Sequence, residues 1–219
     1  MSDPLIAEEL LLLAYHPDTG RPLATDTRLT AGLAGALLAE LALTGRVAIE
    51  RDRVHAAGAS QPGGHPELDL LAAEIARQRR PARVRSWVSR TGSLRLRRAL
   101  QESAVQRRLL NRERVTVLRV FHREDYRPAD PSTRAELLDR LRAMLMGGRA
   151  PDPRSTALLG ILGATRLDRR LFADLPARER RRRMKRLLAD DRIGRAVLAV
   201  IKSVEYVGGG GDGDGGGGE

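Results

Sequence analysis

The sequence predicts a mainly α-helical protein: a single helical-bundle domain with a short β-hairpin or other small β elements. Of the 219 residues, 42% are hydrophobic but only 3% are aromatic, so Leu, Ala, Val and Ile must build the core, which favours helices over sheets. Apolar residues also recur at helical spacing along most of the chain. A chain of this length can bury one sizeable core. We expect residues 1–207 to form that domain and residues 208–219 to be a disordered Gly/Asp tail.

The N-terminal part is expected to begin with two apolar helices. Asp3 and Pro4 are typical of a helix start, an N-cap followed by proline, and the apolar run that follows continues to about Ala14. After a turn-rich loop, leucines spaced four apart within residues 27–43 predict a largely buried helix, which Gly45 terminates. The stretch "RVAIERDRVHAAG" then alternates apolar and polar residues, as a short strand or hairpin does.

The middle of the chain alternates helical segments with breakers. We expect helices over 67–79, before Pro81, over 84–88, and over 94–110. In the last of these, apolar residues occupy one side and arginines the other. The segment "RERVTVLRVFHREDYRP" contains valines and a phenylalanine among other β-formers, and it predicts a β-hairpin.

The C-terminal part predicts four more helices. Pro131 opens a helix that extends to about Met146, and a helix of small apolar residues follows over 155–165. The stretch "FADLPARERRRRMKRLLADD" predicts a strongly basic helix. An apolar helix over 193–204 precedes the glycine-rich tail.

The positive charge of the chain is concentrated in two blocks. The net charge is +11, but residues 76–119 hold 14 arginines against two glutamates, and residues 178–186 hold seven basic residues against one glutamate. The rest of the chain is therefore acidic, with a net charge of −7. Because only Lys185 and Lys202 are lysines, a composition typical of GC-rich bacterial genomes, the choice of Arg over Lys says little by itself. The uneven distribution predicts a polarised surface that faces an anionic partner.

Several chemistries are missing from the sequence. There is no cysteine, which excludes disulfides, thiol catalysis and cysteine zinc sites, and the four histidines are not at metal-ligand spacing. No nucleophile elbow, phosphate loop or dinucleotide fingerprint occurs. We expect no enzyme activity, no catalytic residue, no cofactor and no metal. No apolar run reaches the roughly 18 residues of a membrane span. The expected location is cytoplasmic, with peripheral association to a membrane.

The two basic segments lead to different expectations. In "ERRRRMKRLL", consecutive arginines point all around a helix, and we expect them to cover its surface and face water. In residues 90–98 no acid interrupts the arginines, and their mutual repulsion needs an anionic partner. We predict that Arg95, Arg97 and Arg98 bind a lipid headgroup, with Arg90 in support.

The predicted hairpin is a candidate membrane contact. Clustered basic charge binds an anionic membrane surface best when an apolar element beside it dips into the headgroups. Val115, Val117, Val120 and Phe121 would form that element. The same residues are equally suited to pack in the core or to join subunits of a homo-oligomer, and the sequence leaves this open.

Two other partners compete with the lipid surface. The stretch "ELALTGRVAIERDRV" resembles the helix-to-strand passage of a winged-helix domain, so a nucleic-acid-binding helical domain is the main alternative. We do not favour it, because the preceding helix has Arg28 as its only basic residue and stacking aromatics are missing. An adaptor whose basic face meets an acidic protein is the third hypothesis.

Several stretches, in order, resemble the Golgi phosphoprotein 3 family. They are "LIAEELLLLAY", "GLAGALLAELALTGRVAIE", "SWV", "RVTVLRVFHREDYRP" and "DPRSTALLGILGAT", and the resemblance runs from about Leu5 to Val204. It implies a mostly helical domain with a protruding β-hairpin that binds phosphatidylinositol 4-phosphate at a basic pocket facing the membrane. For eukaryotic members it also implies protein clients, the tails of glycosyltransferases.

The residues of the implied lipid pocket are mostly replaced. Its tryptophan falls near Thr25 and its three arginines at Ala34, Leu94 and Arg97, so only Arg97 carries over. Trp87 matches a tryptophan that we expect to pack below the basic face. A phosphate headgroup is distinguished from bulk anionic lipid by several charge-assisted donors. We therefore expect a binder of anionic phospholipid that keeps the basic face of the family.

Overall fold

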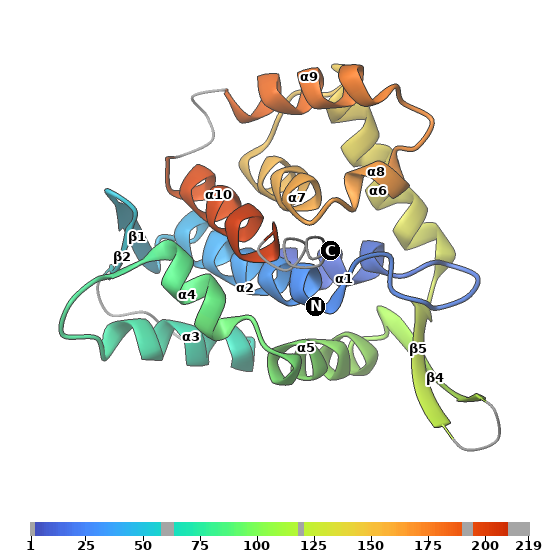
Figure 1. Cartoon of the computed structure of the whole chain (residues 1–219), viewed down its shortest axis with the longest axis horizontal. Coiled ribbons are helices and arrows are strands. Elements are labelled where there is room, and N and C mark those ends of the chain that lie inside the picture. Colours follow the sequence, from blue (N-terminus) through green and yellow to red (C-terminus); the bar gives the residue numbers. More distant parts are fainter. Residues whose placement is uncertain (1–2, 58–63, 118–120, 190–194, 210–219) are drawn as a thin grey trace, which may run out of the picture.

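The computed structural model describes residues 3–57, 64–117, 121–189 and 195–209, and it confirms the mainly α-helical fold with small β elements (Figure 1). Helices and strands follow one another along the chain as α1 (Ile6–Ala14), α2 (Asp26–Leu43), β1 (Val47–Glu50), β2 (Arg53–Ala56), α3 (Pro66–Ala76), β3 (Ala82–Arg83), α4 (Val84–Thr91), α5 (Leu94–Gln106), β4 (Leu110–Val117), β5 (Phe121–Pro128), α6 (Pro131–Met146), α7 (Pro153–Ala164), α8 (Asp168–Leu171), α9 (Ala177–Leu188) and α10 (Arg195–Gly209).

Helix α2 is the centre of the molecule, as its leucine spacing predicts. Every residue from Leu29 to Leu41 is buried, and α1, α4, α5, α7 and α10 pack around it (Figure 1). Gly35 explains the close approach of α10, because a Cβ at this position would lie 2.2 Å from Cγ2 of Val204. The buried apolar side chains form one continuous cluster. The burial of α2 removes it as a recognition helix, which weakens the winged-helix alternative.

Helix α1 begins two residues later than its sequence predicts. Its first residue is Ile6, and the N-cap is Leu5 rather than Asp3. Carboxylates replace the predicted cap: Glu8 accepts a hydrogen bond from the backbone N–H of Leu5 at 2.8 Å, and Glu40 of α2 accepts one from Ile6 at 2.8 Å. The acidic side chains that interrupt this apolar run thus satisfy backbone groups at the helix start.

Two small antiparallel sheets accompany the helices. The predicted hairpin of β1 and β2 gains a third strand, β3, which the sequence did not indicate. Strands β4 and β5 form the second predicted hairpin, in a register that pairs Leu110 with Pro128 and Val117 with Phe121, and they project from the lower edge of the molecule (Figure 1). Helix α5 ends at Gln106 and does not reach residue 110 as predicted, because Leu110 already belongs to β4.

The C-terminal helices form the upper part of the molecule in Figure 1. The basic helix α9 contacts α6 and α7 and begins only after Pro176, and the short helix α8 precedes it. Helix α10 continues to Gly209, two residues into the segment expected to be disordered. The remainder of that tail lies outside the described residues.

Candidate functional site

The first basic block forms a surface on α4 and α5. Val84, Trp87 and Val88 bury one side of α4, and Leu96 and Leu100 bury one side of α5. Ser93 separates the two helices and caps α5, accepting a hydrogen bond from the backbone N–H of Leu96 at 3.2 Å. The arginines between these apolar positions therefore turn outward. We call this the α4–α5 surface, and its exposed arginines are Arg85, Arg90, Arg95 and Arg98.

Arg97, the one pocket residue that the family resemblance carries over, is not exposed with the others. Its Nη1 donates a short hydrogen bond to Oδ1 of Asp26 at the start of α2, and only 14% of its side chain is accessible. Burial lowers the pKa of Arg97, but the neighbouring Tyr15 and Asp26 raise it further, so the net shift is upward and the guanidinium is charged at neutral pH. Arg97 therefore ties α5 to α2, and its role as a headgroup ligand stays a prediction.

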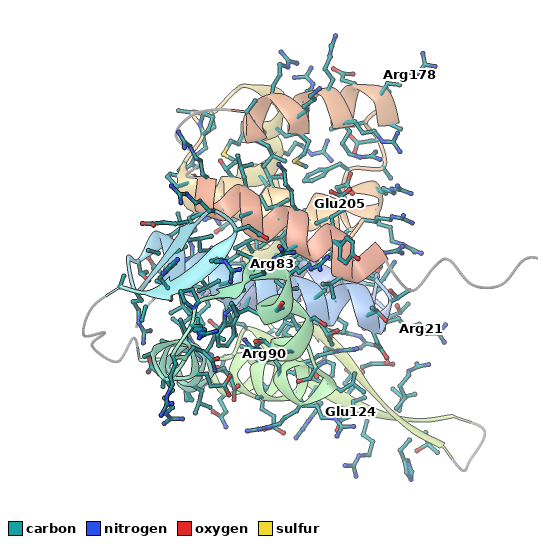
Figure 2. The ribbon with its side chains drawn as sticks, turned by 60° about the vertical axis from the view of Figure 1, so that its left-hand side comes forward. Arg21, Arg83, Arg90, Glu124, Arg178 and Glu205 are labelled. Carbon is teal, nitrogen blue, oxygen red and sulfur yellow. The ribbon has the colours of Figure 1, made fainter. Side chains whose placement is uncertain are left out.

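Arg90 lies over a buried aromatic ring. Its guanidinium carbon is 3.8 Å from the centroid of Trp87, whose side chain is 1% exposed. This confirms that Trp87 packs below the basic face. Such stacking fixes the direction of a guanidinium while leaving its N–H groups available. Figure 2 shows Arg90 and Arg83 on the side of the molecule that carries α4.

Arg90 also lines a pocket between α4, the start of α2 and the end of α10. The cavity measures about 740 Å³, and Arg85 lies opposite Tyr206, 5.1 Å from its ring centroid. Tyr206 is 67% exposed, and Ser86 and Ser89 add two hydroxyl groups. The described lining contains no acidic side chain. We call this cavity the α4–α10 pocket, and it is lined by Thr27, Arg85, Ser86, Ser89, Arg90, Tyr206 and Val207.

Arg95 and Arg98 lie beside this pocket in different settings. Arg95 lines a smaller cavity of about 170 Å³ together with Arg90 and two glutamates of α3, Glu67 and Glu74. The basic face thus has acidic neighbours that the local sequence does not indicate. Among the described residues, neither Arg95 nor Arg98 forms an ion pair, so both remain available on the α4–α5 surface.

Three positions taken from the family resemblance lie in different environments. Thr25 is exposed and caps α2 through its hydroxyl, and Leu94 is 53% exposed at the start of α5. Ala34 is fully buried in the middle of α2. A side chain at position 34 would point into the core of this protein, so the surface pocket has to be built from other residues.

The hairpin contributes charge as well as apolar residues. Val115 is half-buried and lies opposite Arg123, and the strands carry cross-strand pairs such as Arg127 Nη1 to Glu113 Oε1 at 2.8 Å. The backbone pairing of Val117 with Phe121 ends the described ladder. Val120 lies outside the described residues. Membrane contact or subunit contact by this hairpin stays a prediction.

Of the residues that line the α4–α10 pocket, the sequence indicated only Arg90 as a site residue, and it missed Arg85, the two serines and Tyr206. Arg85 belongs to the first basic block, but it lies outside the stretch where the arginines are closest together. Tyr206 lies near the end of a helix read as purely apolar, and it reaches Arg85 only because α10 packs against α4. The available signal was a lone tyrosine with an amphipathic side chain near a helix end.

The described residues contain neither a metal-ligand cluster nor a membrane-spanning helix. Within the described ranges, no group of three or more His, Cys, Asp or Glu side chains is arranged to hold a metal ion. No helix in the part of the chain that the structure describes has the length and apolar character needed to cross a membrane.

Comparison with known proteins gives the family. A search among curated proteins found no significant match. The family model described as Golgi phosphoprotein 3 (GPP34) matches residues 6–204, from the first residue of α1 well into α10. This range contains the hairpin, the central helix and both basic blocks. The chain therefore belongs to the Golgi phosphoprotein 3 family.

Proposed function

We propose that this protein is a peripheral membrane-binding protein, not an enzyme, and that its α4–α10 pocket receives the phosphate of an anionic phospholipid. The observation that carries the proposal is the pocket lining, which combines Arg85 and Arg90 with the hydroxyls of Ser86 and Ser89 and includes no described acid. Guanidinium and hydroxyl donors are the groups that recognise phosphate oxygens.

The surroundings of the pocket suit a membrane surface. Arg95 and Arg98 extend the positive charge beside it, and each basic residue near an anionic leaflet contributes about 1 kcal/mol. Tyr206 is the kind of amphipathic aromatic residue that is enriched at the level of the headgroups. These groups attract negative charge without selecting one headgroup.

The family resemblance would narrow the ligand to phosphatidylinositol 4-phosphate. We propose a broader preference, because Ala34 is buried and Arg97 is held by Asp26. The remaining donors recognise a phosphate group and its negative surroundings. We therefore expect phosphatidylglycerol, cardiolipin and phosphatidylinositol 4-phosphate to bind at equal surface charge with affinities of the same order.

Co-sedimentation with vesicles tests this proposal. The unchanged protein should bind vesicles that contain anionic lipid and not vesicles of phosphatidylcholine alone. The double variant Arg85→Glu/Arg90→Glu should abolish binding, and Arg95→Glu/Arg98→Glu should weaken it. The matched control is Arg178→Glu/Arg182→Glu on α9, which changes the net charge equally and should bind almost as well as the unchanged protein. Because exposed charges are screened within about 8 Å at physiological ionic strength, added salt should weaken binding.

Two results would count against the proposal. If Arg85→Glu/Arg90→Glu binds vesicles as the unchanged protein does, the pocket is not the site. If the α9 control loses binding to the same degree, only total charge matters. A gel shift with duplex and single-stranded probes separates the nucleic-acid alternative, for which we expect no shift at moderate salt.

A further inference from the structure

A second cavity lies between α7, α9 and α10, and it shares the end of α10 with the α4–α10 pocket. It measures about 600 Å³, which is within the range of small-molecule sites. None of its lining residues belongs to α4 or α5, and α5 lies along the opposite edge of the molecule in Figure 1. We call it the α7–α9–α10 cleft, and it is lined by Arg28, Gly160, Gly163, Ala164, Arg166, Asp168, Arg169, Arg181, Met184, Lys185, Leu188, Ile201, Glu205 and Gly209.

The floor of the cleft is apolar and contains open space. Met184 and Leu188 from α9 and Ile201 from α10 face it together with small residues of α7. At Gly163 an added Cβ would approach nothing closer than Met184, at 3.9 Å, so the missing side chain leaves room. Gly160 differs, because a Cβ there would lie 2.2 Å from Cδ1 of Ile201. The glycine at 160 allows the helices to pack, whereas the glycine at 163 widens the cleft.

The rim of the cleft is cationic. Arg181 and Lys185 lie one helical turn apart on α9, and Arg169 extends from α8; all three are exposed and form no ion pair among the described residues. Arg28 and Arg166 add further positive charge. The rim therefore gathers cations from three separate parts of the chain around one apolar floor.

Two acids accompany these cations. Asp168 is already occupied, because its Oδ2 accepts a hydrogen bond from Nε of Arg180 at 2.7 Å. Glu205 is exposed and is located on the α9 side of α10 (Figure 2). Arg169, Arg181 and Lys185 outnumber these two acids even without Arg28 and Arg166, which leaves a local excess of positive charge. An anion that entered the cleft would meet that excess, with Glu205 as the only unpaired acid among the described lining residues.

We propose that the α7–α9–α10 cleft binds one molecule of an anionic amphiphile, an alkyl or monoacyl phosphate, separately from the membrane surface contacted by α4 and α5. The phosphate would lie between Arg181, Lys185 and Arg169, and the hydrocarbon chain would cover Met184 and Ile201. Charge complementarity selects the head, and burial of apolar surface at roughly 25 cal/mol per Å² selects the chain. This proposal does not depend on vesicle binding at the α4–α10 pocket.

Calorimetric titration with decyl phosphate below its micellar concentration tests the cleft directly. We expect saturable binding of one molecule per chain. Inorganic phosphate should bind at least about tenfold more weakly, a loss of roughly 1.4 kcal/mol, because it covers no floor. Decyl maltoside, with the same chain and no charge, should not bind measurably. Equal affinity for inorganic phosphate and decyl phosphate would overturn the proposal, and so would an absence of saturable binding.

Variants separate the two parts of the site. Gly163→Leu fills the floor and changes no charge, and leucine also suits a helix better than glycine. It should abolish decyl phosphate binding. Arg181→Glu/Lys185→Glu should abolish it as well, and its control Arg182→Glu/Arg186→Glu, on the same helix but outside the cleft lining, should bind normally. Glu205→Gln should strengthen binding severalfold.

The fold of each variant is checked by its helical circular dichroism and thermal midpoint. If Gly163→Leu keeps the native signal and still binds decyl phosphate with unchanged affinity, the cleft is not the site. If Gly163→Leu fails to fold, the charge variants decide. In that case, unchanged decyl phosphate binding by Arg181→Glu/Lys185→Glu overturns the proposal. Loss of this binding in Arg181→Glu/Lys185→Glu but not in Arg182→Glu/Arg186→Glu supports it.

Discussion

Helices α5 and α9 are both rich in arginine and lie at opposite edges of the molecule (Figure 1), yet they use their arginines in related ways. Each helix turns one arginine inward and binds it to an aspartate of another segment. In α5, Arg97 pairs with Asp26 of α2. In α9, Arg180 pairs with Asp168 of α8 at 2.7 Å. The remaining arginines of both helices are exposed, except Arg183, whose side chain is 20% exposed and pairs with Glu179.

The two inward pairs differ in depth. The side chain of Asp26 is 66% exposed, whereas that of Asp168 is only 11% exposed, and Arg180 also donates to the carbonyl oxygens of Phe172 and Leu175 at 3.4 and 3.3 Å. The pair in α9 is therefore a buried structural link, and the pair in α5 is a partly solvated one. A basic helix can be anchored from inside and still present a charged outer surface.

The largest effect is expected for Arg180→Ala. It leaves Asp168 buried without its partner, and breaking a buried pair in this way costs about 3–5 kcal/mol. The free energy of unfolding from urea denaturation measures the loss. Arg178→Ala on the exposed side of α9 is the control, and its effect should stay within about 0.5 kcal/mol. Equal stability of Arg180→Ala and Arg178→Ala would show that the buried pair of α9 does not stabilise the fold measurably, so burial would not distinguish it from the pair of α5.

Neither inward arginine was predicted, because Arg97 was expected to bind a headgroup and the arginines of α9 were expected to face water. Arg180 is four residues before the buried Met184, and Arg97 is four residues before the buried Gln101, so helical spacing places each on the buried side. The partners come from other segments, and Asp26 is 71 residues away from Arg97. Local patterns predicted most helices and both hairpins, because apolar periodicity depends on neighbouring residues. Ion pairs between segments need the tertiary fold.

The functional site divides in the same way. Arg90 was predicted from charge density, and it does line the α4–α10 pocket. Arg85 and Tyr206 join it only through the packing of α10 on α4. The cleft beside α9 was not predicted at all, since its apolar floor combines residues of α7, α9 and α10 and its cations come from α2, α9 and the segment around α8. A pocket shared by distant segments leaves no spacing to recognise in the sequence.

A smaller effect is expected for Arg97→Ala. The pair with Asp26 is partly solvated, so the loss should be about 1–3 kcal/mol, the range for a hydrogen bond to a charged group. Vesicle binding should remain, because Arg97 faces Asp26 rather than the lipid. Urea denaturation and co-sedimentation measure the two quantities on one preparation. Arg95→Ala should give the reverse pattern, with little loss of stability and weaker vesicle binding. If Arg97→Ala keeps full stability but loses vesicle binding, Arg97 is a ligand after all.

The smallest effect concerns the surface of α9, which has an acid of its own. Glu179 accepts a hydrogen bond from Nη2 of Arg183 at 2.5 Å, and this bond, together with the charge of Arg183, holds the pKa of Glu179 below its ordinary value of about 4.3. Because the folded-state pKa is the lower one, the pair stabilises the fold above the ordinary pKa and loses this contribution as the pH falls through the folded-state value.

Glu179→Gln tests this contribution in α9. Its stability should be slightly below that of the unchanged protein at pH 7, and the difference should disappear in acid once Glu179 is protonated. Carboxyl NMR titration of Glu179 reports the pKa directly, and high salt should move it back toward the ordinary value because the pair is partly exposed. A Glu179 midpoint at or above the ordinary glutamate value would mean that α9 carries its outer charge without this local compensation.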